Sequence, residues 1–330
     1  MLRKTSEIAA STEAGGSTFT RGDYWRWAKP VALAALFALA GFLLYRTLRG
    51  YDFDKLVDSV LSVPLDHLAS AICWAAASYL CLTGFDWLGL RYVNKPLPYR
   101  KVALASFVSL SLGHNIGFDG LSSGAIRYRF YSREGLTAAE VAKLVMFSAT
   151  TVGLGLMILA GISLIARPEE AGRIVGLGRT PLLAIAAACL IVPLGYLLLA
   201  WRVRRPLSIY RWEFETPNIR LALAQIVLGP LNFACVAACL HQVLSSSFDV
   251  SYLATASVFV LAVTAMLLAH IPGGLGVIES VIVYLMPESG VLPLVLVFRF
   301  VYFLLPLSIG GALFILSEFR ASGTGDEAAR

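Results

Sequence analysis

Charged residues are scarce in this chain. Asp, Glu, Lys and Arg make up 15% of the 330 residues, whereas hydrophobic residues make up 58%. A soluble domain carries about 25% charged residues. Together with a mean hydropathy of +0.73, this composition excludes an ordinary soluble protein and indicates a polytopic membrane protein. The Lys and Arg residues that give the net charge of +6 cluster between apolar runs, which is typical of membrane topology and not of nucleic-acid binding.

Several catalytic and cofactor motifs are also missing. The sequence contains no Walker-type nucleotide loop, no nucleophile elbow and no His/Cys constellation with metal-ligand spacing. Cys235 and Cys239 share a helix face, but no His or acidic pair falls at a matching spacing, so we expect no metal and no cofactor. A disulfide framework is not expected either, because all five cysteines lie inside apolar runs: Cys73, Cys81, Cys189, Cys235 and Cys239.

Apolar runs then define the domain organisation. A helix needs about 20 residues to cross the hydrocarbon core, and most runs meet that length. Residues 1–27 are rich in Ser, Thr, Gly and Ala, do not resemble a cleavable signal, and are expected to form a disordered cytoplasmic tail. We expect a membrane domain over 28–318 and a second cytoplasmic tail over 319–330. The runs are 28–48, 67–90, 102–117, 141–166, 181–201, 221–243, 251–271 and 291–317.

The loop charges select one topology. If 102–117 enters and leaves on the same side, four polar segments with 17 Lys and Arg residues share one face, against six on the other. If every run crosses, the charges fall on both faces, contrary to the positive-inside tendency. A second hairpin at 271–288 brings the C-terminus to the positive face as well. The sequence therefore predicts six spans, two re-entrant hairpins and cytoplasmic termini.

Two glycine-rich, helix-breaking sites follow apolar runs in different halves of the chain. Each reads His, then Gly three places on, then Gly three further. Broken backbone is tolerated at membrane depth only where protein or water surrounds it, so matched interruptions point to a transport site and are compatible with an inverted repeat. The alternative is that the glycines only allow close helix packing. The predicted hairpin residues are Gly117, Gly120 and Gly124 at the first site, and Pro272, Gly273, Gly274 and Gly276 at the second.

Charged and polar side chains near the breaks are the candidate headgroup contacts. Ser123 and Glu279 each lie three residues after the last His-linked glycine, one turn into the second limb, where helix N-H groups favour an anion. Glu279 and Arg299 are expected to pair or to share a polar cavity, because a lone charge inside a bilayer costs about 2.5–3.5 kcal/mol. A purely structural ion pair is the alternative.

Arginine and histidine complete this set of candidates. Arg127 and Arg129 follow the first break and could hold a phosphate, or could anchor a cytoplasmic loop. His114 and His270 could titrate near neutral pH or could bond loose backbone carbonyls at the breaks. Asp86 and Asp119 are weaker candidates.

The chain resembles the transmembrane region of bacterial lysylphosphatidylglycerol synthetases over about residues 30–320. The resemblance rests on 111–117 (Ser-Leu-Gly-His-Asn-Ile-Gly), 123–129 (Ser-Gly-Ala-Ile-Arg-Tyr-Arg), 271–279 (Ile-Pro-Gly-Gly-Leu-Gly-Val-Ile-Glu) and the last run with Arg299 and Pro306. In two-part members this region resembles a lipid flippase, and a C-terminal domain makes the aminoacylated lipid. Because this chain ends thirteen residues after Ser317, the resemblance implies lipid translocation or binding without aminoacyl transfer.

Residues and resemblance together predict an all-α transmembrane bundle in the bacterial cytoplasmic (inner) membrane. We expect it to bind an anionic or glycosylated amphiphilic lipid and to move it between leaflets without covalent chemistry, with lipid-biosynthesis enzymes as possible partners and no nucleic acid. Two alternatives stay open: a membrane-embedded transferase that uses Glu279 or His114 as a base, and a non-catalytic scaffold for lipid-modifying enzymes.

Overall fold

The structure is a computed structural model. It describes residues 53–116, 119–166, 168–169, 172, 176–202, 207–209, 212–214, 216–269, 274–287 and 289–327. The chain divides into two compact units, Met1–Tyr45 and Arg46–Arg330, and everything below concerns the second. The first apolar run, 28–48, and the predicted tail over 1–27 lie outside the described residues.

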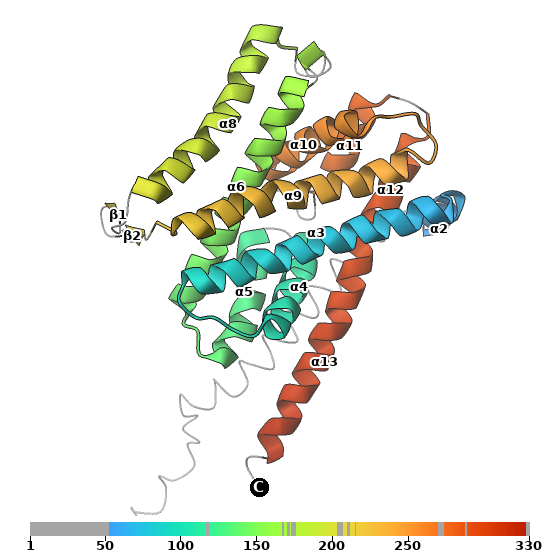
Figure 1. The fold of residues 1–330 in the computed structure, drawn as a ribbon. Helices are drawn as coiled ribbons and strands as arrows, with labels where there is room; N and C mark the ends of the chain where they lie inside the picture. Colours follow the sequence, from blue (N-terminus) through green and yellow to red (C-terminus); the bar gives the residue numbers. More distant parts are fainter. Residues whose placement is uncertain are drawn as a thin grey trace, which may run out of the picture. The chain divides into compact units, whose positions relative to one another are not determined.

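Helices dominate the described part of the chain (Figure 1), with one small two-stranded pairing. The pairing joins β1 (Leu207–Ile209) antiparallel to β2 (Trp212–Phe214), inside a segment that the sequence indicated only as a polar loop. The helices are α2 (Phe53–Ser62), α3 (Leu65–Tyr92), α4 (Tyr99–Ile116), α5 (Asp119–Tyr131), α6 (Ala138–Ala166), α8 (Arg179–Arg202), α9 (Ile219–Leu244), α10 (Tyr252–Ala269), α11 (Val277–Leu285), α12 (Val291–Arg299) and α13 (Leu305–Glu327), with a 3-10 turn over Ser132–Glu134.

Five helical stretches are long and apolar enough to cross a membrane: Leu65–Tyr92, Ala138–Ala166, Arg179–Arg202, Ile219–Leu244 and Val291–Phe319. Each coincides with an apolar run that the sequence predicts as a span, within a few residues at either end. A shorter apolar helix covers Tyr252–Leu267. The chain is therefore a multi-pass helical membrane protein, as expected from its composition.

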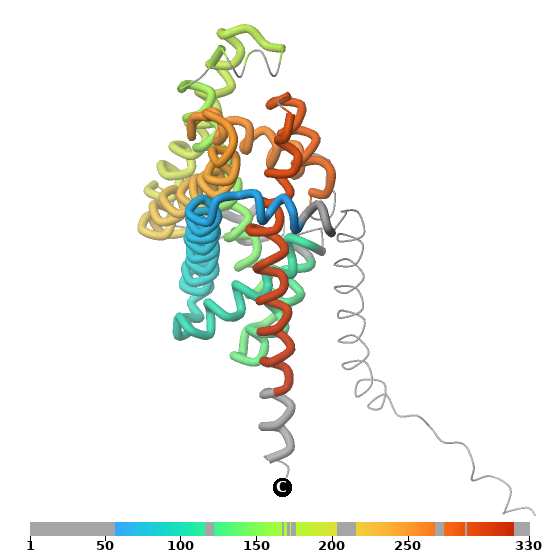
Figure 2. Tube along the Cα trace, turned by 90° about the vertical axis from the view of Figure 1, so that its right-hand side faces the viewer, coloured from blue at the N-terminus to red at the C-terminus, as the bar shows by residue number. Residues whose placement is uncertain are grey.

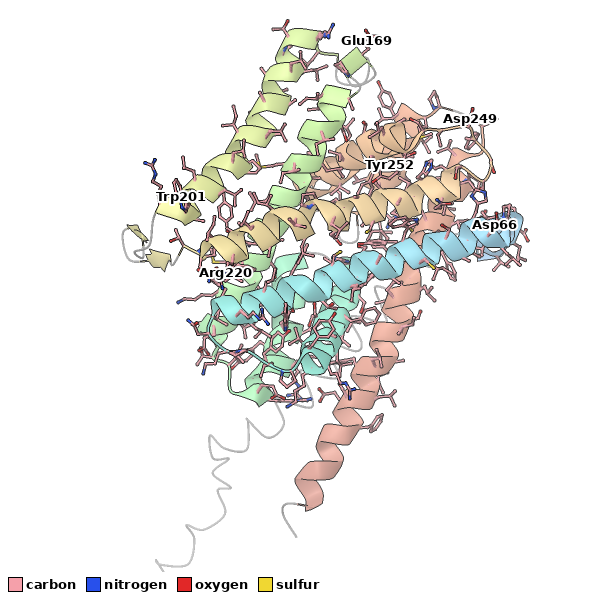
Figure 3. The ribbon with its side chains drawn as sticks, viewed as in Figure 1. Asp66, Glu169, Trp201, Arg220, Asp249 and Tyr252 are labelled. Carbon is pink, nitrogen blue, oxygen red and sulfur yellow. The ribbon has the colours of Figure 1, made fainter. Side chains whose placement is uncertain are left out.

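The centre of the bundle is the antiparallel pair α3 and α9, which lie side by side and share a large part of the apolar core. Figure 3 shows Asp66 and Asp249 at one end of this pair and Arg220 at the other. Local signals set where these helices begin: Pro64 precedes α3, and the Asn218 side chain caps α9 by accepting a hydrogen bond from the Leu221 N-H at 2.9 Å.

Helix α6 crosses α9 at a glycine pair. A Cβ added to Gly155 would lie 2.4 Å from the carbonyl carbon of Gly229, so only glycine allows the two backbones to approach so closely. Small residues at helix crossings serve this purpose in membrane proteins. The crossing fixes α6 against the α3–α9 pair, and α8 packs on the outside of α6.

Two helical hairpins follow the breaks that the sequence predicts. At the first, α4 ends at Ile116 and α5 begins at Asp119, and the two helices pack against each other. At the second, α10 ends at Ala269 and α11 begins at Val277, and these also pack together. Gly274 and Gly276 precede α11 with φ of +57° and +79°, a left-handed conformation that favours glycine. Gly117, His270, Pro272 and Gly273 lie outside the described residues.

The last span is not one regular helix. A π-helical turn over Phe300–Leu304 separates α12 from α13. Such turns are rare in proteins, and those that do occur are often found at functional sites. Figure 2 shows α13 beside α4, and the two helices pack together. The last span therefore contacts the second hairpin through α12 and the first hairpin through α13.

Candidate functional site

A buried arginine–carboxylate pair joins the first hairpin to a span. Arg127 of α5 donates from Nε and one terminal nitrogen to the Asp86 carboxylate of α3, at 2.9–3.1 Å. Its other terminal nitrogen donates to the Ser123 hydroxyl at 2.8 Å. Asp86 is 0% exposed and Arg127 only 3%, so Arg127 is not the solvent-exposed loop anchor that the sequence left open.

Two further side chains complete the hydrogen bonds of Asp86. The Tyr131 hydroxyl donates to it at 3.0 Å, and the Ser148 hydroxyl of α6 lies at 3.5 Å. Tyr131 ends α5 and lies outside the span-length helices. Burial raises the pKa of its phenol well above the usual value, and the charge of Asp86 raises it further, so Tyr131 remains a donor at neutral pH.

A second buried pair joins the second hairpin to the last span. Arg299, the last residue of α12, forms an ion pair with Glu279 of α11 and donates from a terminal nitrogen to its Oε2 at 2.9 Å. The same nitrogen donates to the carbonyl of Gly274. The guanidinium carbon lies 5.4 Å from the centre of the Phe303 ring. The contact that the sequence predicts between Glu279 and Arg299 is therefore confirmed.

The π-helical turn lies directly after Arg299, and side chains from two other helices donate to its carbonyl groups. The Tyr79 hydroxyl of α3 donates to the Tyr302 carbonyl at 3.4 Å, and the Asn115 side-chain amide of α4 donates to the Phe303 carbonyl at 3.5 Å. An irregular turn changes the pairing of backbone carbonyls, and buried carbonyls need partners. The turn thus connects Arg299, the residue directly before it, to Asn115 near the tip of the first hairpin.

The other predicted residues lie around these two pairs. His114, in the last turn of α4, has its ring centre 6.4 Å from those of Tyr79 and Phe303. Gly120 lies in the first turn of α5. Gly124 lies inside the same helix, where an added Cβ would meet only Val145, at an ordinary 3.5 Å. Arg129 points to a different carboxylate, Glu318 of α13, at 2.8 Å.

Sequence reasoning gave too little weight to three of these residues. Asp86 was only a weak candidate, although a lone carboxylate in an apolar run requires a partner. Tyr131 and Asn115 carried no signal, because their roles depend on neighbours more than forty residues away in the chain. Arg127 and Arg299 belong to two separate ion pairs, in which each arginine has its own carboxylate.

The two ion pairs are built alike, but the charge that the hairpin supplies is positive in the first pair and negative in the second. In each, the second limb of a hairpin supplies one charged residue and a span supplies the other: Arg127 with Asp86, and Glu279 with Arg299. Arginine can hold a phosphate or carboxylate with two parallel hydrogen bonds, and a carboxylate can accept an amine. Each arginine is held against its carboxylate inside the apolar bundle.

Comparison with known proteins agrees with the resemblance. The chain is 29% identical over 296 residues to the uncharacterized protein slr0712 of Synechocystis, covering 88% of this chain and 91% of that protein. It is 27% identical over 307 residues to the inner membrane protein YbhN of Escherichia coli, covering 90% and 94%. It is 24% identical over 295 residues to the phosphatidylglycerol lysyltransferase of Staphylococcus aureus, of which it covers 33%.

A family model also matches nearly the whole membrane domain. The match runs over residues 31–310 and carries the description lysylphosphatidylglycerol synthase TM region. Both hairpins and both buried pairs lie inside these limits. The chain belongs to the family of the lysylphosphatidylglycerol synthase TM region.

Proposed function

We propose that this chain binds an amphiphilic lipid in the cytoplasmic (inner) membrane of a bacterium and moves it between leaflets. In this proposal α4–α5 and α10–α11 are re-entrant hairpins that enter the bilayer from opposite sides. Their second limbs carry Arg127 and Glu279 into the bundle, where the two hairpins act as related halves of one transport path.

The observation that carries the proposal is the pair of buried ion pairs. A charge inside a bilayer is costly and marks substrate pathways more often than it marks simple structure. Here two arginines and two carboxylates are buried, and in each pair one partner belongs to a hairpin and the other to a span. A bundle held together by apolar packing alone would not need them.

In the mechanism we infer, the lipid headgroup exchanges with the resident partner of each pair. A phosphate takes the place of Asp86 at Arg127, with the hydroxyl of Ser123 beside it. His114 and Arg129 lie on the same hairpin and are further candidate contacts, and His270 has the matching position in the sequence of the second break. Arg299 and Glu279 receive the headgroup in the other half, with the π-helical turn as the link between them. The acyl chains stay in hydrocarbon throughout, and no bond is made or broken.

Support also comes from the relatives. One is an inner membrane protein, and another is a phosphatidylglycerol lysyltransferase, whose name refers to an anionic phospholipid. We infer an anionic or glycosylated lipid as the substrate class of this chain, and lipid-biosynthesis enzymes as its partners.

Leaflet exchange of fluorescent lipids in vesicles that contain the purified chain tests the proposal. Dithionite bleaches the outer leaflet, so lipids that cross are counted by the additional loss of fluorescence. Glu279→Gln and Arg127→Gln should each slow exchange at least tenfold. Lys101→Gln is the matched control, because this exposed lysine pairs with Glu134 and not with a residue of either buried pair.

Three results would contradict the proposal. The first is no exchange of phosphatidylglycerol, a glycolipid or an isoprenoid phosphate by the unmodified chain. The second is equal exchange by the Glu279→Gln variant. The third is a new lipid product seen by chromatography, which would identify a membrane-embedded transferase instead.

A further inference from the structure

A separate cluster of charges lies at the exit of the first hairpin. Arg129 donates to Oε2 of Glu318 at 2.8 Å and also reaches Oε1, and Arg133 donates to Oε1 at 2.5 Å. Two guanidinium groups thus share one carboxylate, and the three side chains together carry one net positive charge. The cluster of Arg129, Arg133 and Glu318 joins α5 and the 3-10 turn after it to the end of the last span.

The exposure of the three groups is unequal. The Glu318 side chain is only 11% exposed, whereas those of Arg129 and Arg133 are 40% and 33% exposed. The carboxylate therefore lies deeper than the two arginine side chains and holds their guanidinium groups together, while part of each arginine side chain is exposed. Spare N-H donors of arginine suit an oxyanion with several acceptor oxygens, such as a phosphate.

The position of the cluster matches the depth of lipid headgroups. Glu318 is the penultimate residue of the span-length stretch Val291–Phe319. Two large aromatic side chains next to the cluster are exposed, Tyr128 at 45% and Phe319 at 73%. Exposed aromatic residues at the end of a span are typical of the membrane–water interface. The cluster consequently faces the layer in which lipid phosphates lie, on the side that the loop charges predict to be cytoplasmic.

A neighbouring ion pair shows the contrast. Lys101 and Glu134 form a one-to-one salt bridge at 2.8 Å close to the same turn. That pair is neutral overall. Of these two clusters, the arginine cluster is the one that carries a surplus positive charge.

We propose that Arg129 and Arg133 form a phosphate-binding site for the headgroup of an anionic phospholipid at the cytoplasmic interface, with Glu318 as the group that positions both arginines and competes with the phosphate. This inference rests on the proposed function: the lipid would bind at this site before its headgroup reaches the buried pair at Arg127. Lipid binding at the site is measured without transport, so either proposal can fail while the other stands.

Native mass spectrometry of the full chain in detergent, titrated with short-chain phosphatidylglycerol, measures the binding. Each arginine contributes charge-assisted hydrogen bonds, so Arg129→Gln and Arg133→Gln should each weaken the tightest site about tenfold. Glu318→Gln should tighten it by about threefold to tenfold, because the competing charge is removed while the amide still accepts. The charge-matched controls Lys101→Gln and Glu134→Gln should change it by less than about twofold.

Three further arms identify the ligand and guard against misfolding. A diacylglycerol without phosphate should not bind at this site. Inorganic phosphate should displace phosphatidylglycerol only at far higher concentration; displacement at equal concentration would assign the site to free phosphate. Arg129→Lys and Arg133→Lys keep the charge and should retain part of the affinity. Equal losses in Lys101→Gln and Arg129→Gln, or weaker binding in Glu318→Gln, would overturn the proposal.

Discussion

Removing one charge from the Asp86–Arg127 pair should be far more harmful than removing both. Asp86→Asn removes the counter-ion of Arg127, which is only 3% exposed. Arg127→Gln removes the counter-ion of Asp86, which is 0% exposed. Breaking a buried pair in this way costs about 3–5 kcal/mol. The double variant carries no charge at these two positions and can keep an amide–amide hydrogen bond at the same place.

The structure predicts a large coupling for these two substitutions. Asp86 accepts three guanidinium hydrogen bonds of 2.9–3.1 Å, and either single variant removes the attraction between the two charges, so the second substitution has little more to remove. We expect the double variant to be more stable than the sum of the single effects by about 2–3 kcal/mol, the upper part of the range for contacting residues.

The free energy of unfolding in bicelles, measured by titration with a denaturing detergent, gives all four corners of this double-mutant cycle. Tyr131→Phe serves as a further check, since it removes one hydrogen bond to Asp86 and leaves both charges. It should cost about 1–3 kcal/mol, less than either charge removal. If the two single effects add within about 0.5 kcal/mol, the pair is not coupled and the reasoning is refuted.

Three backbone predictions follow from the same structure. Gly155→Ala should destabilise the α6–α9 crossing by about 1–3 kcal/mol, because the new methyl group meets Gly229. Gly153→Ala is the control and should be neutral or stabilising, since its methyl group would have no atom within 4 Å. Equal effects of the two substitutions on thermal unfolding would contradict the close crossing. Gly276→Ala also meets no atom within 4 Å, so its cost of about 1–2 kcal/mol comes from a φ of +79° alone, and Gly276→Asn should recover part of it. Asn218→Ala removes the cap of α9 and should lower the free energy of unfolding by about 1 kcal/mol; no change would show that the cap is dispensable.

Hydropathy was sufficient to predict most of the fold. The run 67–90 became Leu65–Tyr92, and 181–201 became Arg179–Arg202. The physical reason is that a span must satisfy its own backbone within an apolar stretch, which leaves a one-dimensional signal in the sequence. The breaks were visible for the same reason, because Gly and Pro interrupt that signal.

The site could be predicted only in part. Glu279 and Arg299 are the deepest charges in their half of the chain, so their pairing followed from the cost of burying either alone. The partner of Arg127 was missed because Asp86 precedes it by 41 residues, and nothing in a helical period connects them. The sequence did not predict the π-helical turn over Phe300–Leu304 or the β1–β2 pairing. The carbonyl groups of the turn meet side chains of α3 and α4, which no local pattern shows.

The account depends on each hairpin beginning and ending on the same side of the membrane, which the labelling of introduced cysteines tests directly. Lys95 and Ser132 flank α4–α5, and Ser247 and Ser289 flank α10–α11; all four are exposed. Each is changed to Cys in a chain whose native cysteines are replaced. A membrane-impermeant maleimide is then applied to right-side-out and inside-out vesicles.

The re-entrant arrangement predicts that Lys95→Cys and Ser132→Cys react only from the cytoplasmic side, and Ser247→Cys and Ser289→Cys only from the opposite side. Labelling of Lys95→Cys and Ser132→Cys from opposite sides would mean that the first hairpin crosses the membrane. That result would contradict the shared transport path.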